Sequence, residues 1–393
     1  MSDASRTRLL TRPETAWGED APANAATTRQ RFTGETLSVQ NKTVTSLEIR
    51  PDRQLTDMPL VAIDAAGDIS QEAIYGPQFD ELLEATLCGT WGTANETTSL
   101  TTTSGLATVV IGSGAVKFNQ ADVGKTITGA GIPGGTTILS VQDATHATMS
   151  ANATASATIT ATIAARYGQL RNGVTNRSFG IEAGFLDIAR YIYFSGCIPS
   201  KFALDVTARA LIKMTTSWMG RKGVPSTSSI AGTMTPTEPG TNAPMRAGSG
   251  ISILSAGTSN VEIVGVVAKR VTIDFTNALR ARDLATSEFA AEPGRDAMTI
   301  TGTLETYFND ITILQAFLAN QFFAMRFNMA DLGIVGLPNT YQFTFPAMKV
   351  SQGNVPIPGN TADVMQVLNW SALLDSGVGY SVDVKRNLAT LAS

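Results

Sequence analysis

Two arginines and an aspartate stand close together in the stretch "SLEIRPDRQ", residues 46–54. Arg50, Asp52 and Arg53 could clamp a phosphate, because guanidinium groups form paired hydrogen bonds with phosphate oxygens. The same residue types also set the register of an interface when each arginine meets a carboxylate of a neighbouring chain. No glycine-rich cradle or aromatic platform accompanies the cluster. We therefore favour an interface over a salt bridge within the loop, and both over a ligand site.

The other candidates for chemistry are weaker. The only histidine, His146, lies in "QDATHATMS", so the chain offers no Ser-His-Asp or Cys-His arrangement in a suitable setting. "GAGIPGG" has the glycines of a phosphate-binding loop, but no Gly-Lys-Ser/Thr follows it, and it indicates turns. Cys88 and Cys197 form no CxxC pair and are expected to be buried thiols. We predict no catalytic, cofactor-binding or metal site and no enzymatic activity.

The composition excludes several classes of function. Lys and Arg number 29 and Asp and Glu 33, and a net charge of -4 gives no general affinity for DNA or acidic membranes. No stretch approaches the roughly 18 apolar residues of a membrane span, and the N-terminus lacks the apolar core of a signal peptide. Thr, Ala, Gly and Ser are abundant, which favours strands, tight turns and packing against further copies of the chain.

An internal repeat organises the elements that must position the arginines. "TSLEIRPDRQLTD", "GDISQEAIYG" and "FDELLEATL" are matched in order by "VTIDFTNALRARDL", "RDAMTITGTLETY" and "NDITILQAFL". The match makes Ile49 and Phe275 equivalent core residues. Each unit is predicted as strand, spacer, strand, short helix and further strands, because apolar residues alternate in the strands and share one face of the helix. The candidate inter-subunit contacts are Arg50, Asp52, Arg53 and their looser counterparts Arg280 and Arg282.

Changes in composition divide the chain into segments. Residues 92–165 are nearly free of charge and alternate Thr/Val/Ile runs with Gly, Asn and Pro turns, which predicts a small inserted β-module. Such an insert should project from the body, with its ends near Trp91 and Arg166 close together. The predicted segments are an N-terminal arm at 1–40, a discontinuous first domain at 41–91 and 166–222, the insert at 92–165, a linker at 223–260 and a second domain at 261–393.

Three stretches, "RFTGETL", "VTSLEIRPDRQLTD" and "ISQEAIYGPQFDELLEATL", resemble the tail tube proteins of long-tailed, siphovirus-like bacteriophages. The later "AMTITGTLETYFND" has the character of the same fold. The insert resembles the Ig-like β-modules that phage structural proteins often carry. The resemblance implies a mainly β fold with two tandem tube domains, each a β-sandwich or barrel with a short flanking α-helix, and an inserted β-sandwich module.

The resemblance also implies a function, that of a structural virion protein whose stacked rings form the tail tube and its channel for the genome. The implied partners are further copies of the chain and the tape measure, terminator and distal tail proteins. DNA would pass without specific binding, and assembly in the host cytoplasm would precede residence in the virion tail. If single-unit relatives form six-fold rings, a two-unit chain can close the same ring as a homotrimer.

Two other functions stay open. The first is another virion β-protein, such as a tail terminator, a baseplate hub or a decoration protein, and the near-full-length duplication favours the tube over it. The second is a carbohydrate-binding adhesin that works through the insert. Glycan sites usually present exposed aromatic rings, whereas residues 93–165 contain only Phe118.

Overall fold

The computed structural model describes residues 3–52, 54–112, 118, 122–235, 245–255, 268–309, 311–331, 340–357 and 363–386. Arg53 lies outside these residues. Strand makes up 57% of the structure and helix 6%, so the prediction of a mainly β fold is confirmed. The described strands build a large sheet but no closed barrel.

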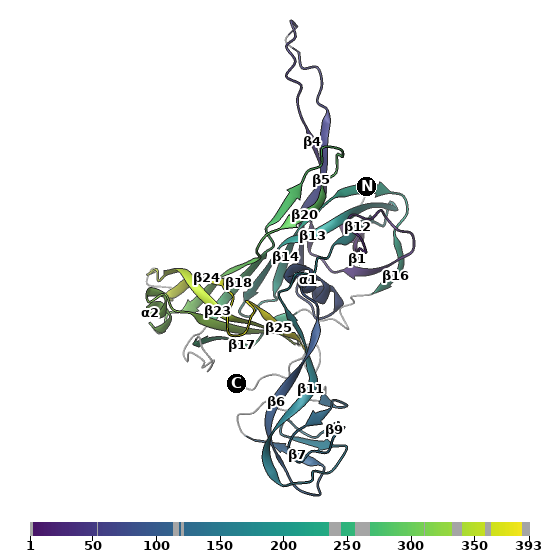
Figure 1. Cartoon of the computed structure of the whole chain (residues 1–393). Coiled ribbons are helices and arrows are strands. Elements are labelled where there is room, and N and C mark those ends of the chain that lie inside the picture. Colours follow the sequence, from purple (N-terminus) through teal and green to yellow (C-terminus); the bar gives the residue numbers. More distant parts are fainter. Residues whose placement is uncertain are drawn as a thin grey trace.

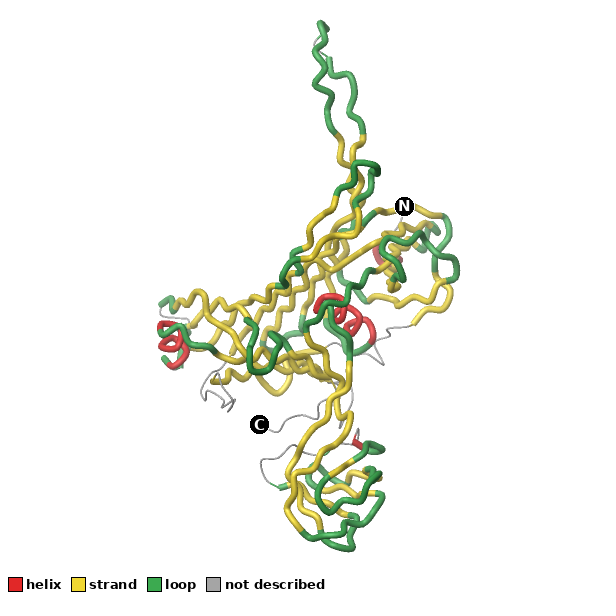
Figure 2. The backbone as a smooth tube through the Cα atoms, in the orientation of Figure 1, coloured by secondary structure: helices red, strands yellow, loops and turns green. Residues whose placement is uncertain are grey.

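A central β-body carries two projections (Figure 1). At one end a long hairpin of β4 (Ser38–Thr43) and β5 (Leu60–Glu72) extends away from the body. At the other end β6 (Gly92–Thr102) and β11 (Ala157–Arg171) form a ribbon that leads to a smaller β-body. Figure 2 shows that strands dominate the central body, that the smaller body combines strands with many loops, and that the tip of the long hairpin is loop.

Strands of the first half form two layers that share one long strand. In the first layer β5 pairs with β4 and with β14 (Lys213–Gly220), which in turn pairs with the second part of β13 (Arg190–Thr207). The first part of β13 continues into the second layer, where it pairs with β12 (Phe179–Phe185) and β15 (Lys222–Ser226). A strand this long ties the layers together, so their inner faces enclose a core.

The first forty residues were predicted as an extended arm, but most of them belong to the sheets. β1 (Thr7–Pro13) pairs with β12 and with β2 (Ala25–Gln30), and β3 (Gly34–Glu35) pairs with β5. The predicted linker also contributes strands, since β16 (Ala231–Thr235) pairs with β2, and β17 (Met245–Ser255) pairs with β22. The polar side chains of these segments gave no sign of strand pairing, because backbone groups make the hydrogen bonds between strands.

The second half repeats the arrangement of the first. β18 (Ala268–Thr276), β21 (Thr299–Tyr307), β24 (Met365–Ala372) and the second part of β23 (Thr340–Asn354) pair in this order, as β4, β5, β14 and β13 do. The first part of β23 pairs with β22 and β25, as that of β13 pairs with β12 and β15. In these pairings β22 spans Phe323–Asp331 and β25 spans Asp383–Arg386.

Each half also places a short helix after the same strand. α1 (Pro77–Leu87) follows β5, and α2 (Thr312–Leu318) follows β21. No helix in the described part of the chain is long and apolar enough to cross a membrane. The remaining elements are the 3₁₀ turn η1 (Ala4–Arg6), β7 (Thr108–Ile111), β8 (Ile127–Thr128), β9 (Ile138–Val141), β10 (His146–Met149), β19 (Leu279–Arg282) and β20 (Ala291–Arg295).

A glycine opposite a tryptophan marks the register of the repeat. Gly67 of β5 lies opposite Trp218, and Gly302 of β21 lies opposite Trp370. A Cβ on Gly302 would lie 2.6 Å from the Trp370 ring and 2.0 Å from a backbone oxygen of β18, so the strand needs glycine there. The two glycines are therefore equivalent positions from which the halves can be aligned.

The sequence match that made Ile49 and Phe275 equivalent is wrong. Phe275 is fully buried, whereas Ile49 is 97% exposed near the hairpin tip. When Gly67 is aligned with Gly302, the residue in the first half that is equivalent to Phe275 is Val39. The residue equivalent to Ile273 is Leu37. "TLSVQ" and "SLEIR" both alternate apolar and polar residues, and only pairing with β5 decides which of them enters the sheet.

One core spans both halves, and the insert has its own. Phe79 of α1 and Phe202 of β13 belong to the same cluster as Phe275 and Tyr341 of the second half. The ring centroids of Phe202 and Phe275 are 6.0 Å apart, and those of Phe79 and Tyr341 are 4.8 Å apart. A separate cluster fills the insert, whose ends lie side by side because β6 and β11 pair there, as predicted. The domain boundaries themselves stay a prediction.

We expect Gly302→Ala to destabilise the fold, because the added methyl group would overlap the Trp370 ring and the backbone of β18. Overpacking of this kind costs about 1–3 kcal/mol, which thermal denaturation would detect. Gly112→Ala is the matched control, since a Cβ there meets no atom within 4 Å. Equal melting temperatures for the two variants would contradict the steric account.

Candidate assembly surfaces

The two halves of the chain meet through β13 and β18. Their antiparallel ladder runs from Lys201 opposite Thr276 to Thr207 opposite Arg270. Alternate side chains on both strands enter the shared core and are fully or almost fully buried. These are Phe202, Leu204 and Val206 from β13 and Val271, Ile273 and Phe275 from β18. We call this ladder and its side chains the internal junction.

Ion pairs cross the internal junction on the face away from the core. Arg270 donates hydrogen bonds to Asp205, with Nη2–Oδ2 and Nε–Oδ1 distances of 2.8 and 3.0 Å, and its Nη1 lies 3.5 Å from Glu305. The hydrogen bond from Arg270 lowers the pKa of Asp205. Lys201 pairs with Asp274 at 3.1 Å. Such half-exposed pairs contribute about 0–1 kcal/mol each, so they favour the register while the buried side chains supply the stability.

The large sheet ends in two strands with an open edge. Among the described residues β4 pairs only with β5, and residues 349–354 of β23 pair only with β24. By the repeat, β4 corresponds to β18 and this part of β23 corresponds to the part of β13 that carries β18. The two edges therefore correspond, by the repeat, to the two strands that meet at the internal junction. Unpaired N–H and C=O groups at such edges are a template for pairing with another chain.

The face of this sheet opposite the core is polar and carries both signs of charge. Hydroxyl side chains alternate with charged ones, and cations pair across neighbouring strands, as in Lys42 with Asp64. No cluster of basic side chains without acidic neighbours appears on the described part of this face. Its charged residues are Asp64, Asp68, Glu72, Asp205, Asp274, Glu305, Lys42, Lys201, Lys213, Arg270 and Lys349.

The long hairpin holds the first group of predicted contacts. Arg50 Nε and Nη2 donate to the Asp52 carboxylate at 3.0 and 2.7 Å, so in the single chain this pair closes within the loop. Both side chains are about 40% exposed, at 43% and 39%. Leu47 and Ile49 beside them are 92% and 97% exposed. The role of Arg50, Asp52 and Arg53 between subunits stays a prediction.

The second hairpin, β19–β20, holds the other predicted arginines. Arg280 Nε lies 2.9 Å from Asp296 Oδ2, and Arg282 is exposed on the same strand. This hairpin is shorter and folds back against the base of the first, where the backbone N–H of Ile63 donates to the carbonyl of Glu288 at 2.8 Å. Arg50 on the one side and Arg280 and Arg282 on the other thus lie on two different hairpins.

A joint centred on α1 holds the C-terminal strand to the first half. Asp80 accepts a hydrogen bond from the Tyr341 hydroxyl at 2.7 Å and forms an ion pair with Arg386 of β25. The Arg386 guanidinium lies 4.5 Å from the centre of the Trp91 ring. Burial raises the pKa of Asp80 to about 6, although Tyr341 and Arg386 oppose the rise. The sequence offered no sign of this joint, because its members are distant along the chain.

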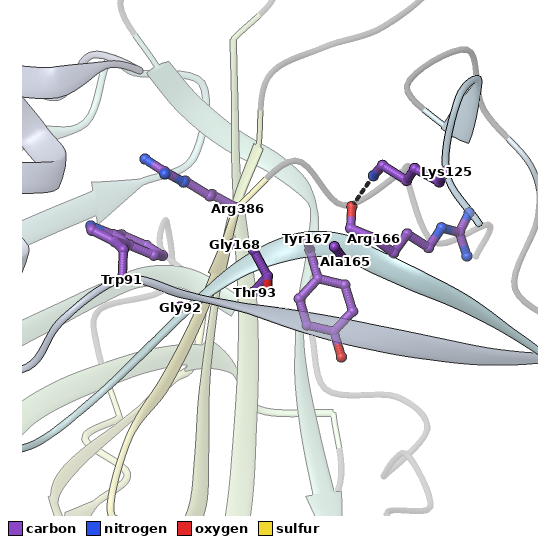
Figure 3. Close-up of a pocket in the computed structure, with 9 residues that line it drawn as sticks. All are labelled: Trp91, Gly92, Thr93, Lys125, Ala165, Arg166, Tyr167, Gly168 and Arg386. Carbon is purple, nitrogen blue, oxygen red and sulfur yellow. Dashed lines mark hydrogen bonds between the residues drawn. The ribbon is translucent and has the colours of Figure 1, made fainter. Parts of the chain in front are cut away.

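A cavity of about 590 Å³ separates this joint from the base of the insert (Figure 3). Three cationic side chains line it, and each has a partner in the same chain. Lys125 donates to the carbonyl of Arg166, Arg166 pairs with Asp122 at 3.0 Å, and Arg386 pairs with Asp80. The first two contacts lie within the insert and its β11 strand, the third joins β25 to α1, and we assign no ligand to the cavity.

The residues considered for chemistry form local structure. His146 Nδ1 lies 2.9 Å from Asp143 Oδ2, and the same carboxylate accepts the backbone N–H groups of Thr145 and His146, which is a turn in the insert. Cys197 is buried, which raises the pKa of its thiol. Cys88 is only half-buried, and its sulfur lies 3.0 Å from Arg295 Nη1.

Comparison with known protein families matches residues 4–372 to a family described as phage tail tube protein. The match covers both halves and extends across the insert. No curated protein matches the chain.

We expect Glu81→Gln to raise the melting temperature by an amount that grows from pH 5 to pH 8. Burial, then Glu84 and Asp80, raises the pKa of Glu81 to about 7 from an ordinary 4.5. Its protonated form therefore stabilises the fold at low pH, and this stability is lost as the pH rises through 7. Glutamine carries no charge, so the variant does not lose this stability as the pH rises.

The measurement is thermal denaturation of parent and variant across this pH range. Glu48→Gln, in the exposed hairpin, is the control for the substitution itself. A melting-temperature difference between Glu81→Gln and the parent that stays constant with pH would refute the assignment.

Proposed function

The chain belongs to the phage tail tube protein family and is a structural component of the virion tail. We propose that three copies close into a ring and that stacked rings form the tube. The observation that carries this proposal is the pair of open edges at the ends of the large sheet. One chain already contains the junction that these edges would form between chains.

The register of the inter-chain junction follows from the repeat. Trp218 lies opposite Pro199 in β13, and Trp370 lies opposite Val350 in β23, and in both long strands the register shifts directly afterwards. The residues beyond the shift, Lys201 and Gln352, are therefore equivalent. If the open edges pair in the register of the ladder between β13 and β18, Gln352 lies opposite Gln40 of the next copy. Asn354 then lies opposite Ser38 of the same next copy.

Three copies suffice because each chain supplies two units. Head-to-tail contacts generate a closed ring when the rotation between units closes. Internal and inter-chain junctions would then alternate around the ring, which gives six units of the same shape from three chains. One continuous sheet would run around the channel, with β4, β5, β14, β13, β18, β21, β24 and β23 contributed by every copy.

The polar face of this sheet would line the channel. A lining rich in unpaired cations would hold DNA phosphates, whereas here Lys42, Lys201 and Arg270 are paired with carboxylates. DNA would then pass without specific binding. The core side of the sheet is covered by the second layer and cannot face the channel.

The long hairpin would contact the next ring of the stack. Apolar side chains rarely stand so exposed without a partner, and a cluster of them marks an interaction surface. Leu47, Ile49, Leu55 and Met58 are 92%, 97%, 78% and 61% exposed. Arg50, Asp52 and Arg53 would add register at this contact, as Arg280 and Arg282 would at the shorter hairpin. The tape measure, terminator and distal tail proteins are the proposed further partners, after assembly in the host cytoplasm.

Oxidation of the double variant Ser38→Cys, Asn354→Cys should link the chains through disulfides, and the largest product should have the mass of three chains. Both side chains are exposed in the single chain, and the proposed register places them opposite each other between chains. Non-reducing electrophoresis gives the result, with each single variant as control for the native cysteines. Only monomers, or an unlimited ladder of products, would count against the closed trimer.

The double variant Leu47→Asp, Ile49→Asp should form rings that do not stack. The two side chains are almost fully exposed, so the melting temperature of the single chain should not change. Electron microscopy would show rings in place of tubes. Val174→Asp, at a position that is 94% exposed, controls for a new surface charge. Normal tubes from the hairpin variant would remove this surface from the stacking contact.

A further inference from the structure

At one inward-facing position the inter-chain junction carries a charged side chain where the internal junction carries an apolar one. In the internal junction, Val271 of β18 lies opposite Leu304. At the open edge, Glu35 of β3 lies opposite Ile69. Ile69 and Leu304 each stand two residues after the marker glycine of their strand, so Glu35 occupies the place of Val271. A carboxylate thus replaces a buried valine.

The partner position is also defined by the repeat. Val206 lies opposite Val271 in the internal junction and is buried. Val206 follows Lys201 by the same five residues that separate Ile357 from Gln352. Ile357 therefore takes the place of Val206, and it is 89% exposed in the single chain. In a ring, Ile357 of one copy would cover Glu35 of the next.

The Glu35 side chain points inward, toward the space between the two layers. It lines a cavity of about 460 Å³ together with Leu9, Phe32 and Ala183. Burial raises the pKa of Glu35, and its Oε1 is buried without a hydrogen-bond partner in the described part of the chain. Arg8, in the same lining, is held by Glu182 at 3.1 Å. Glu35 is half-buried in the single chain, on a strand that pairs only with β5 among the described residues.

We propose that Glu35 is a brake on ring closure, a carboxylate that the Ile357 side chain of a second copy must cover before the edges can pair. This inference rests on the proposed function. Covering a charged group without a new partner is unfavourable, and inward-pointing charges are a known means of keeping edge strands from pairing. Pro356 lacks an N–H group and so removes one hydrogen bond from the same segment.

The brake explains how two versions of one junction can behave differently. Val206 and Val271 close the internal junction as the chain folds, because both are apolar and belong to one molecule. In free solution the inter-chain junction closes only at a higher protein concentration, because covering Glu35 is unfavourable. Hairpin contacts with a ring that is already in place would offset this cost, so closure would occur on the growing tube in preference to free solution.

The test compares the total protein concentration at which rings form, measured by sedimentation velocity and checked by electron microscopy. Glu35→Val restores the residue type of the internal junction and should lower this concentration at least tenfold. Glu35→Gln removes the charge but keeps a polar group, and should give an intermediate value. Glu96→Val, on a half-buried strand position of the insert, is the matched control and should behave like the parent.

Ile357→Glu tests the other side of the same contact. The side chain is 89% exposed, so the fold of the single chain should not change, and a second carboxylate facing Glu35 should raise the concentration at least tenfold. If Glu35→Val forms rings only at the parent's protein concentration or at a higher one, the proposed brake is wrong. Ring formation by Ile357→Glu at the parent's concentration overturns the register. If neither the parent nor Glu35→Val forms rings, the proposed function fails and the brake falls with it.

Discussion

The hydrogen-bond ladder between β13 and β18 is the interaction on which the rest of the structure depends. It joins two copies of one strand arrangement into a single sheet, and it brings Phe202 and Phe275 into one core. A sheet built in this way ends in two edges that correspond, by the repeat, to the two strands that the ladder joins. In the proposed ring the chain holds one junction closed and presents the two halves of another.

The two-layer construction explains how the halves are held in place. β13 and β23 each run through both layers, so neither layer can slide relative to the other without breaking a ladder. Asp80 adds a polar anchor, because Tyr341 and Arg386 of the second half both converge on this residue of α1. The insert stays outside this system, with its own core and a two-stranded connection.

Charge has three separate uses in the molecule. On the open face, carboxylates lie across from cations, which leaves the surface hydrated without a basic patch. At α1, the largely buried Asp80 is tolerated because the Tyr341 hydroxyl and the Arg386 guanidinium reach it. At the β3 edge, Glu35 has no such partner for one oxygen among the described residues. The same side-chain chemistry therefore pairs with cations or anchors a helix according to what surrounds it, and in the proposed brake it opposes contact.

Local composition was sufficient to predict the β-rich class, the duplication and the insert, since alternation, turn residues and the lack of charge are read over a few neighbouring positions. It could not determine the strand register. Leu37 and Val39 alternate with polar residues just as Leu47 and Ile49 do, and only pairing with β5 places the first pair in the sheet and the second in solvent. Nor could it reveal the open edges, the α1 joint or the inward direction of Glu35. These depend on contacts between segments far apart in the chain, and the residues that make them carry no local mark of their partners.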